Sequence, residues 1–165
     1  MVFDEDRTRL GFLAEREVIP FGHFVMTRVV VERLTSLRLR THIRRDGLDH
    51  WCLNLSMRGH RRFRWDRGDQ CLSVPAGQLH VQSLDEAYRS TAEDLDWVGV
   101  FFARDRLPAL STHLDATRGT PRTDALPRML AEYLARLWPV LPTMAPDELS
   151  RAADATSAMM RACLC

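Results

Sequence analysis

The chain has 165 residues, of which 45% are hydrophobic and 27% are charged, and its formal net charge at pH 7 is +1. This length and composition are typical of one globular domain with one core, and they exclude a fibrous or low-complexity chain. The near-neutral charge excludes a whole-protein field that would attract nucleic acid or an acidic membrane surface.

Two features of the sequence indicate the compartment. No apolar run approaches the roughly 20 residues that cross a bilayer, and the first residues do not read as a signal peptide. The four cysteines, Cys52, Cys71, Cys163 and Cys165, do not have the spacing of a zinc site. We therefore expect a cytoplasmic protein with reduced thiols and no membrane partner.

Up to about residue 120, short runs rich in β-branched and aromatic residues alternate with turn signals. This pattern is typical of an antiparallel sandwich or barrel. The predicted strands cover residues 21–31, 37–44, 50–57, 60–65, 70–74, 79–83 and 97–103. The predicted breaks are Asp46-Gly47, Gly59, Asp66-Arg67-Gly68 and Pro75-Ala76-Gly77.

Residues 50–57 alternate between an apolar phase and a polar phase. The apolar phase is Trp51, Leu53, Leu55 and Met57, and the polar phase is His50, Cys52, Asn54 and Ser56. One phase should face a core and the other a more polar space, because successive side chains of a strand point to opposite faces. On the next predicted strand Arg61 shares the phase of Phe63 and Trp65, which is unexpected for a plain core position.

After residue 120 the apolar period becomes helical. The first stripe contains Leu126, Met129, Leu130, Tyr133, Leu134 and Leu137, and the second contains Leu149, Ala152, Ala153, Thr156, Met160, Cys163 and Leu164. Thr123 or Asp124 can cap the first helix, Pro139 ends it, and Pro146 begins the second. The short turn between them favours an antiparallel helix pair, and the small Ala152 and Ala153 allow close helix packing.

The segment Pro75-x-Gly77-x-x-His80 matches the centre of a metal-binding motif of cupin barrels. Such a site needs more ligands, normally a His-x-His pair and a glutamate on preceding strands, whereas this chain offers His50, Cys52 and Asn54 there. We therefore predict no metal and no cofactor. A stand-alone metal-dependent enzyme of the cupin type remains the alternative function.

Other kinds of site have weaker support. Five arginines, Arg58, Arg61, Arg62, Arg64 and Arg67, suggest a phosphate-binding hairpin, but a solvated hairpin surface explains them as well. The sequence has no nucleophile elbow and no glycine-rich phosphate loop, so we predict that the protein is not an enzyme.

A binding pocket inside the barrel is the remaining possibility, because small barrels can enclose one small ligand. The candidate lining mixes aromatic bodies with polar tips. Its candidate ligand-binding residues are His42, Arg44, His50, Asn54, His80 and Trp97. The alternative is that these are ordinary strand positions.

Three segments, CLNLSMRGHRRFRW, LSVPAGQLH and WVGVFFARDRL, together resemble the N-terminal cupin-like domain of AraC-family transcription regulators. The order and spacing of the motifs carry the resemblance, which includes Arg58-Gly59, the aromatic pair Phe101-Phe102, the Arg104-x-x-Leu107 pattern and the helical stripe 130–137. Gln78 stands where the family usually has an aspartate.

The resemblance implies a mainly β fold, in which a cupin-like antiparallel barrel of the jelly-roll type is followed by an antiparallel helix pair. Residues 1–120 would form the effector-binding barrel, with residues 1–13 as an N-terminal arm, and residues 121–165 would form the dimerisation helices. By position, Arg44 corresponds to a ligand-binding arginine of sugar-sensing members, and Trp97 lies on the strand that carries their aromatic platform.

The resemblance also implies the partners. These are a small-molecule effector, a second copy of the chain in a homodimer, and DNA through a C-terminal helix-turn-helix domain that is absent from this chain. The predicted dimerisation residues are Leu130, Tyr133, Leu134, Leu137, Ala153 and Met160. The alternative is that both helical stripes only cover the barrel.

Overall fold

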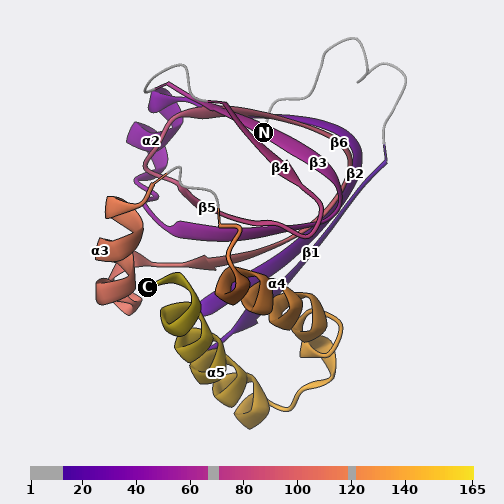
Figure 1. Ribbon diagram of the computed structural model, residues 1–165, viewed down its shortest axis with the longest axis vertical. Helices are drawn as coiled ribbons and strands as arrows, with labels where there is room; N and C mark the ends of the chain where they lie inside the picture. The colour runs from indigo at the N-terminus through magenta and orange to yellow at the C-terminus, as the bar shows by residue number, and fades with distance from the viewer. Residues whose placement is uncertain (1–12, 67–70, 119–121) are drawn as a thin grey trace.

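The computed structural model describes residues 13–66, 71–118 and 122–165, and it shows a curled antiparallel sheet with helices against one side. Figure 1 shows the strands curving around an interior, with α4 and α5 packed below them. Apart from Leu13, the predicted N-terminal arm lies outside the described residues, and so does the predicted boundary at residue 120.

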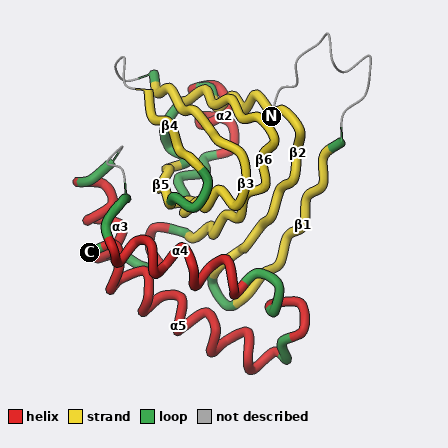
Figure 2. Tube along the Cα trace, turned by 45° about the vertical axis from the view of Figure 1, so that its right-hand side comes forward, coloured by secondary structure: helices red, strands yellow, loops and turns green. Residues whose placement is uncertain are grey.

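The sheet contains six strands, and every pairing is antiparallel. They are β1 (Ala14–Phe21), β2 (Phe24–Arg38), β3 (Trp51–Trp65), β4 (Cys71–Pro75), β5 (Leu79–Ser83) and β6 (Tyr88–Phe102). Their order is β1-β2-β6-β3-β4, and β5 pairs with the other half of β3. The mainly β fold with C-terminal helices is confirmed, but the closed barrel is not, because the pairings of the described strands leave the sheet open (Figure 2).

Some elements differ from the predicted ones. The predicted strand 37–44 is wrong, because β2 ends at Arg38 and Arg40–Asp46 form the helix α2. His42 Nδ1 accepts a hydrogen bond from the Leu39 backbone N–H (3.2 Å), which satisfies a donor at the start of this helix. Strand β1, the first half of β6 and the helix α3 (Pro108–Ala116) were not predicted.

The segments predicted as two strands on either side of Gly59 form one strand, β3, which is bulged at this point. The register between β3 and β6 shifts between Ser56 and Arg58 and again between Arg58 and His60. Gly59 has a φ of 74°, and a Cβ there would lie 2.3 Å from the Asp94 carbonyl oxygen. Asp94 itself has a φ of 47°. The two strands therefore approach so closely that β3 needs glycine at this position.

The bulge changes which side chains of β3 face the interior. Before Gly59 the inward side chains are the even-numbered Cys52 and Asn54, and after it Arg61, an odd-numbered residue, lines the same cavity. A strand without a bulge would keep one parity along its length. This explains why Arg61 shares an apolar phase in the sequence.

The opposite face of the sheet packs against the helices and forms the main core. This core joins strand residues such as Met26, Leu53 and Phe102 to helix residues such as Leu110 and Leu134. A second cluster lies inside the curl and consists of Val29, Val31, Leu34, Ala92 and Leu95, with Trp97 against it. The same strands therefore serve two separate environments, one on each face.

The predicted helix pair is confirmed as α4 (Ala125–Leu137) and α5 (Pro146–Leu164), which lie side by side in Figure 2. Pro146 starts α5, and Glu148 Oε2 accepts a hydrogen bond from the Ala145 backbone N–H (2.9 Å). Helix α5 packs closely on the turn between β1 and β2, because a Cβ on Gly22 would lie 2.5 Å from the Ala153 Cβ. The small side chain of Ala153 therefore allows close packing within one chain.

We predict that Gly59→Ala destabilises the protein by roughly 3–5 kcal/mol, because the methyl group adds an overlap with the β6 backbone to the cost of a positive φ. Gly77→Ala is the matched control: Gly77 has a φ of 80°, but a Cβ there would have no neighbouring atom within 4 Å, so we expect about 1–2 kcal/mol. Urea unfolding followed by circular dichroism measures both. Equal losses in the two variants would show that the close approach of β3 to β6 does not matter.

Candidate functional site

The curled sheet encloses a cavity of about 140 Å³ between β2, β3, β5 and β6. Its apolar lining comes from Val29, Leu34, Leu84, Trp97 and Phe101. Its uncharged polar lining comes from Thr27, Ser36, Cys52, Asn54, Gln82 and Tyr88. Arg61 is buried in its wall, and the exposed Arg16 of β1 reaches its rim. A mostly apolar cavity with a few polar groups is what a small-molecule site requires.

Arg61 is 5% exposed and sits among aromatic rings. Its guanidinium carbon lies 4.5 Å from the centre of the Phe63 ring and 5.5 Å from that of Trp97. Its Nε and Nη2 donate hydrogen bonds to Ser90 Oγ, at 3.2 and 3.0 Å. Burial lowers the pKa of Arg61, but a guanidinium keeps its proton in proteins. Arg61 therefore places a positive charge in a nearly water-free wall.

Three neutral groups lie near Arg61. Asn54 pairs with His80 across β3 and β5, and Asn54 Oδ1 accepts a hydrogen bond from the Cys52 thiol (3.2 Å). Burial raises the pKa of Cys52 to about 12, so it stays a thiol. Burial, and then the charge of Arg61, lower the pKa of His80 well below its usual value, so the ring is uncharged. None of these groups balances the charge of Arg61.

Two side chains next to the cavity, one buried and one half-buried, have buried polar atoms without a partner. Within the described part of the chain, neither ring nitrogen of His80 has a hydrogen-bond partner, and the same holds for Trp97 Nε1. Buried polar atoms are normally paired, because leaving one unpaired costs about 1–3 kcal/mol. The cavity wall therefore has unused hydrogen-bonding capacity.

The surroundings of His80 do not suit a metal ion. Its neighbours are the aromatic ring of Phe63, at 4.5 Å between ring centres, and the amide of Asn54 across the strand pair. The charge of Arg61 also opposes a cation nearby. Among the residues described, no group of three His, Cys, Asp or Glu side chains is placed to hold a metal ion.

The structure brings some of the predicted ligand-binding residues together and separates others. Asn54 and Trp97 line the cavity, and His80 lies beside it. Arg44 and His42 lie on α2, where Arg44 lines a separate surface hollow of about 310 Å³ with Arg40 and Asp66 among its neighbours. The prediction that a strand carries Arg44 into the interior is wrong, because residues 40–46 form a helix instead.

The remaining predicted residue of this set, His50, lies just before β3. Its Nδ1 is 3.7 Å from an Asp49 carboxylate oxygen, and it does not line the cavity. The charged cavity-lining residue that the sequence did not assign to the pocket is Arg61. Its signal was present, since a charged residue in an apolar phase marks a buried position with a special role, but the bulge that turns it inward could not be read from the pattern.

Most of the predicted dimerisation residues are buried within one chain. Leu130, Leu134, Leu137, Ala153 and Met160 all belong to the main core between the helices and the sheet. Tyr133 is half-buried, and its hydroxyl is 2.9 Å from Thr156 Oγ1 of α5. The apolar side chains of α4 that remain exposed are Leu126 and Met129, at 51% and 55%.

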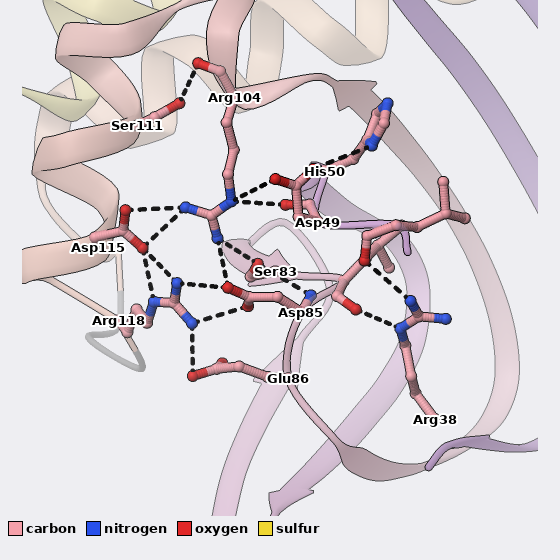
Figure 3. A network of polar contacts seen from close by, with 12 residues as sticks. Arg38, Asp49, His50, Ser83, Asp85, Glu86, Arg104, Ser111, Asp115 and Arg118 are labelled. Carbon is pink, nitrogen blue, oxygen red and sulfur yellow. Dashed lines mark hydrogen bonds and ion pairs between the residues drawn. The ribbon is translucent and has the colours of Figure 1, made fainter. Parts of the chain in front are cut away.

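A second polar cluster joins α3 to the β5–β6 turn and to the segment before β3 (Figure 3). Arg104 Nη1 donates to the Asp115 carboxylate at 2.9 and 3.0 Å, and its Nη2 donates to Ser83 Oγ at 2.7 Å and to Asp85 Oδ2 at 3.1 Å. Arg118 binds Asp85 through two nitrogens, at 2.9 and 3.1 Å. Figure 3 shows the two guanidinium groups converging on Asp85 and Asp115.

Both arginines of this cluster have carboxylate partners, unlike Arg61 in the cavity wall. Its two arginines face Asp85 and Asp115, and Glu86 adds a further carboxylate 2.9 Å from Arg118. Both guanidinium groups also lie over the Trp51 ring, at 4.4 and 5.1 Å. The charged groups of this cluster pair with one another, so we assign it a structural role that fixes α3 to the sheet.

We predict that Asp85→Asn lowers the free energy of unfolding at pH 7 by about 1 kcal/mol, because solvent screens a side chain that is 34% exposed. Burial alone would raise the pKa of Asp85, but the hydrogen bonds from Arg118 and Ser83 outweigh it and lower the pKa. The contribution is therefore complete above the unfolded pKa, near 4, and is lost as the pH falls through the folded value.

Urea unfolding of the wild type and Asp85→Asn from pH 7 to pH 3 measures this difference. The matched control is Asp147→Asn, which removes an exposed pair with Arg151 on α5 and should change stability by less than about 0.5 kcal/mol. A gap between wild type and Asp85→Asn that stays constant down to pH 3 would contradict the assignment.

No protein-family model matches the sequence of this chain, and no curated protein matches it either. None of the described helices has the length and apolar character needed to cross a membrane.

Solved structures do match. The AraC-like transcriptional activator CuxR superposes on 93% of this chain with a TM-score of 0.85 and 22% sequence identity. This chain covers 56% of the length of that one. An RmlC-like cupin protein from Desulfovibrio desulfuricans superposes on 62% of this chain, with 16% identity and a TM-score of 0.42. The superposition covers 88% of the cupin protein's own length. The cupin domain of an XRE-family transcriptional regulator from Enterobacter cloacae superposes on 55% of this chain and 96% of its own, at 7% identity and a TM-score of 0.40.

The second and third similarities are too low to carry an argument, but the first extends over nearly the whole described chain. At 22% identity it establishes the fold, including the sheet and the helices against it. The resemblance that the sequence motifs predicted is thus confirmed at the level of structure: this chain has the fold of part of an AraC-like transcriptional activator.

Proposed function

We propose that this chain is the effector-sensing unit of an AraC-type transcriptional regulator and that it binds a small molecule in the cavity between β2, β3, β5 and β6. The observation that supports this most is the combination of an activator-like fold over 93% of the chain with a cavity whose wall holds unpaired polar groups. The regulator would act in the cytoplasm, and contacts with DNA would come from a further unit of such a protein.

The route from the cavity to the helices is short. On β3, Cys52 and Asn54 face the cavity. Leu53 and Leu55, which alternate with them along the strand, face the main core that includes α4. A ligand that moves β3 therefore also moves the surface on which α4 packs. An effector needs to favour one arrangement of the helices by only about 1–3 kcal/mol to change how DNA-binding units are presented.

The helices are also the proposed dimer surface. The apolar stripes predicted for this role are used inside the chain, so the contact with a second copy must use other side chains. Leu126 and Met129 lie one helical turn apart on α4, and both are more than half exposed. We assign the homodimer contact to this part of α4.

The sensing role is tested by a thermal-shift screen of small metabolites. A ligand at 100 times its Kd adds about 2.7 kcal/mol to the free energy of unfolding, which for a chain of this size corresponds to roughly 5–10 °C. Trp97→Ala and Asn54→Ala should abolish the shift. Trp65→Ala, which removes an indole outside the cavity lining, is the control and should keep it. A screen without stabilising compounds, or hits that act equally on Trp97→Ala, would refute the proposed site.

The dimer is tested by sedimentation of the wild type and of the double variant Leu126→Glu/Met129→Glu. We expect the wild type to be a dimer at micromolar concentration and the variant to be a folded monomer, because two buried carboxylates would oppose association. Val18→Glu, at an exposed apolar position of β1, is the control and should leave the dimer intact. A monomeric wild type, or a variant that still dimerises, contradicts the assignment.

A further inference from the structure

We infer that the effector is a small organic carboxylate, and that its carboxylate group pairs with Arg61 inside the cavity. This inference rests on the proposed sensing function and adds the chemical class of the ligand and the residue that selects it. The carboxylate would supply the negative charge that the cavity wall lacks. The apolar side chains of the lining would hold the body of the molecule.

The charge around Arg61 is the first argument. Three other partly buried arginines have carboxylate partners: Arg28 binds Asp96 through two nitrogens, at 2.9 and 2.8 Å, and Arg104 and Arg118 share Asp85 and Asp115. The half-buried Arg122 donates instead to the neutral Thr117 hydroxyl. Arg61 is more buried than any of these. Yet no Asp or Glu of the described residues forms an ion pair with it, and its hydrogen bonds go to the neutral Ser90.

A buried and unpaired charge is costly, which makes it a recognition feature rather than a packing feature. Replacing such a group by an apolar side chain often stabilises a protein, because no opposite charge offsets the desolvation of the guanidinium. The bulge at Gly59 turns Arg61 inward at this cost. An anion that enters the cavity offsets it, since hydrogen bonds between charged groups are about twice as strong as neutral ones.

The remaining polar groups indicate a single negative charge. Asn54, His80, Cys52 and Trp97 are uncharged, so they can donate or accept hydrogen bonds but cannot balance a second charge. Arg16 reaches the rim from the exposed face of β1, where it can attract an anion but is screened by water. One buried guanidinium matches a monocarboxylate better than a phosphate dianion.

The volume limits the size of the molecule. One buried water molecule requires roughly 10–15 Å³ of cavity volume. A cavity of about 140 Å³ therefore holds a ligand of on the order of ten water-sized atoms. Benzoate and short fatty acids are of this size. The aromatic and aliphatic side chains of the lining, Trp97, Phe101, Val29 and Leu34, suit an apolar body of that kind.

The experiment compares carboxylates with their neutral amides. Benzoate, phenylacetate and hexanoate are titrated against the wild type by calorimetry and thermal shift, next to the three matching amides and inorganic phosphate. We expect at least one carboxylate to raise the melting temperature by roughly 5–10 °C at saturation, whereas its amide and phosphate have little effect.

The variants are Arg61→Gln and the control Arg62→Gln, which removes an exposed arginine next to it on β3. Arg61→Gln should weaken carboxylate binding by roughly 10–100-fold, and Arg62→Gln should leave it unchanged. Without ligand, Arg61→Gln should be at least as stable as the wild type. If Arg61→Gln does not fold, two measurements still test the carboxylate inference. They are the contrast between carboxylate and amide in the wild type and the binding of carboxylates by Arg61→Lys.

Three outcomes would overturn the inference: amides that bind as well as carboxylates, phosphate that binds while the carboxylates do not, or carboxylate binding that survives in Arg61→Gln. Neutral ligands whose binding needs Trp97 but not Arg61 would keep the sensing function and reject the carboxylate. Failure of all seven probes rejects the carboxylate, and the wider metabolite screen then decides the sensing function separately.

Discussion

The close approach of β3 to β6 at Gly59 is the constraint on which the interior of this protein depends. A side chain at residue 59 would overlap the backbone of Glu93 and Asp94, so the two strands can cross here only because glycine leaves the space open. The register shifts on both sides of this crossing reverse the parity of β3. Without the reversal, Arg61 would point to the other face, and the cavity would lose its one buried charge. The backbone geometry at one glycine thus sets the chemistry of the cavity.

Side chains that alternate along the same strands form the main core on one face of the sheet and the cavity on the other. One face holds the main core with α3, α4 and α5, and the other face holds a smaller cluster and the cavity. The charged residues divide in the same way. Arg104 and Arg118 have carboxylate partners and link α3 to the sheet, whereas Arg61, inside the curl, has none among the described residues. The ion pairs that stabilise the fold therefore lie outside the cavity, and the arginine without a carboxylate partner lies in the cavity wall.

Much of the architecture could be predicted from the sequence, because periodicity reports burial. The alternation in 50–57 correctly separated Leu53 and Leu55 from Cys52 and Asn54, and the helical stripes located α4 and α5. Residues 40–44 were wrongly predicted as part of a strand, because a short segment with no buried residue has no clear hydrophobic period. The strand β1 was missed because it is exposed along most of its length, so its charged residues hide the strand pattern.

The site was harder to predict than the fold. Asn54 and Trp97 were correctly expected to face the interior because they lie on regular strands, whereas Arg44 was misplaced with its segment. Arg61 stood out in its apolar phase, but its direction depends on a bulge formed jointly by β3 and β6, which no local pattern reveals. The stripes on the helices indicated burial correctly, but burial within a chain and burial between chains give the same pattern.

The open sheet has a consequence for association between copies of the protein. A closed barrel has no free edge, but this sheet has edge strands, and at β1 and β4 it exposes backbone donors and acceptors that could pair with a strand of another molecule. Both end strands carry features that oppose such pairing. β1 contains the charged run Glu15, Arg16 and Glu17 followed by Pro20, and β4 ends at Pro75. Proline lacks the N–H that an added strand would need, and charges on an edge disfavour stacking. These two edges are thus protected against uncontrolled strand addition and aggregation.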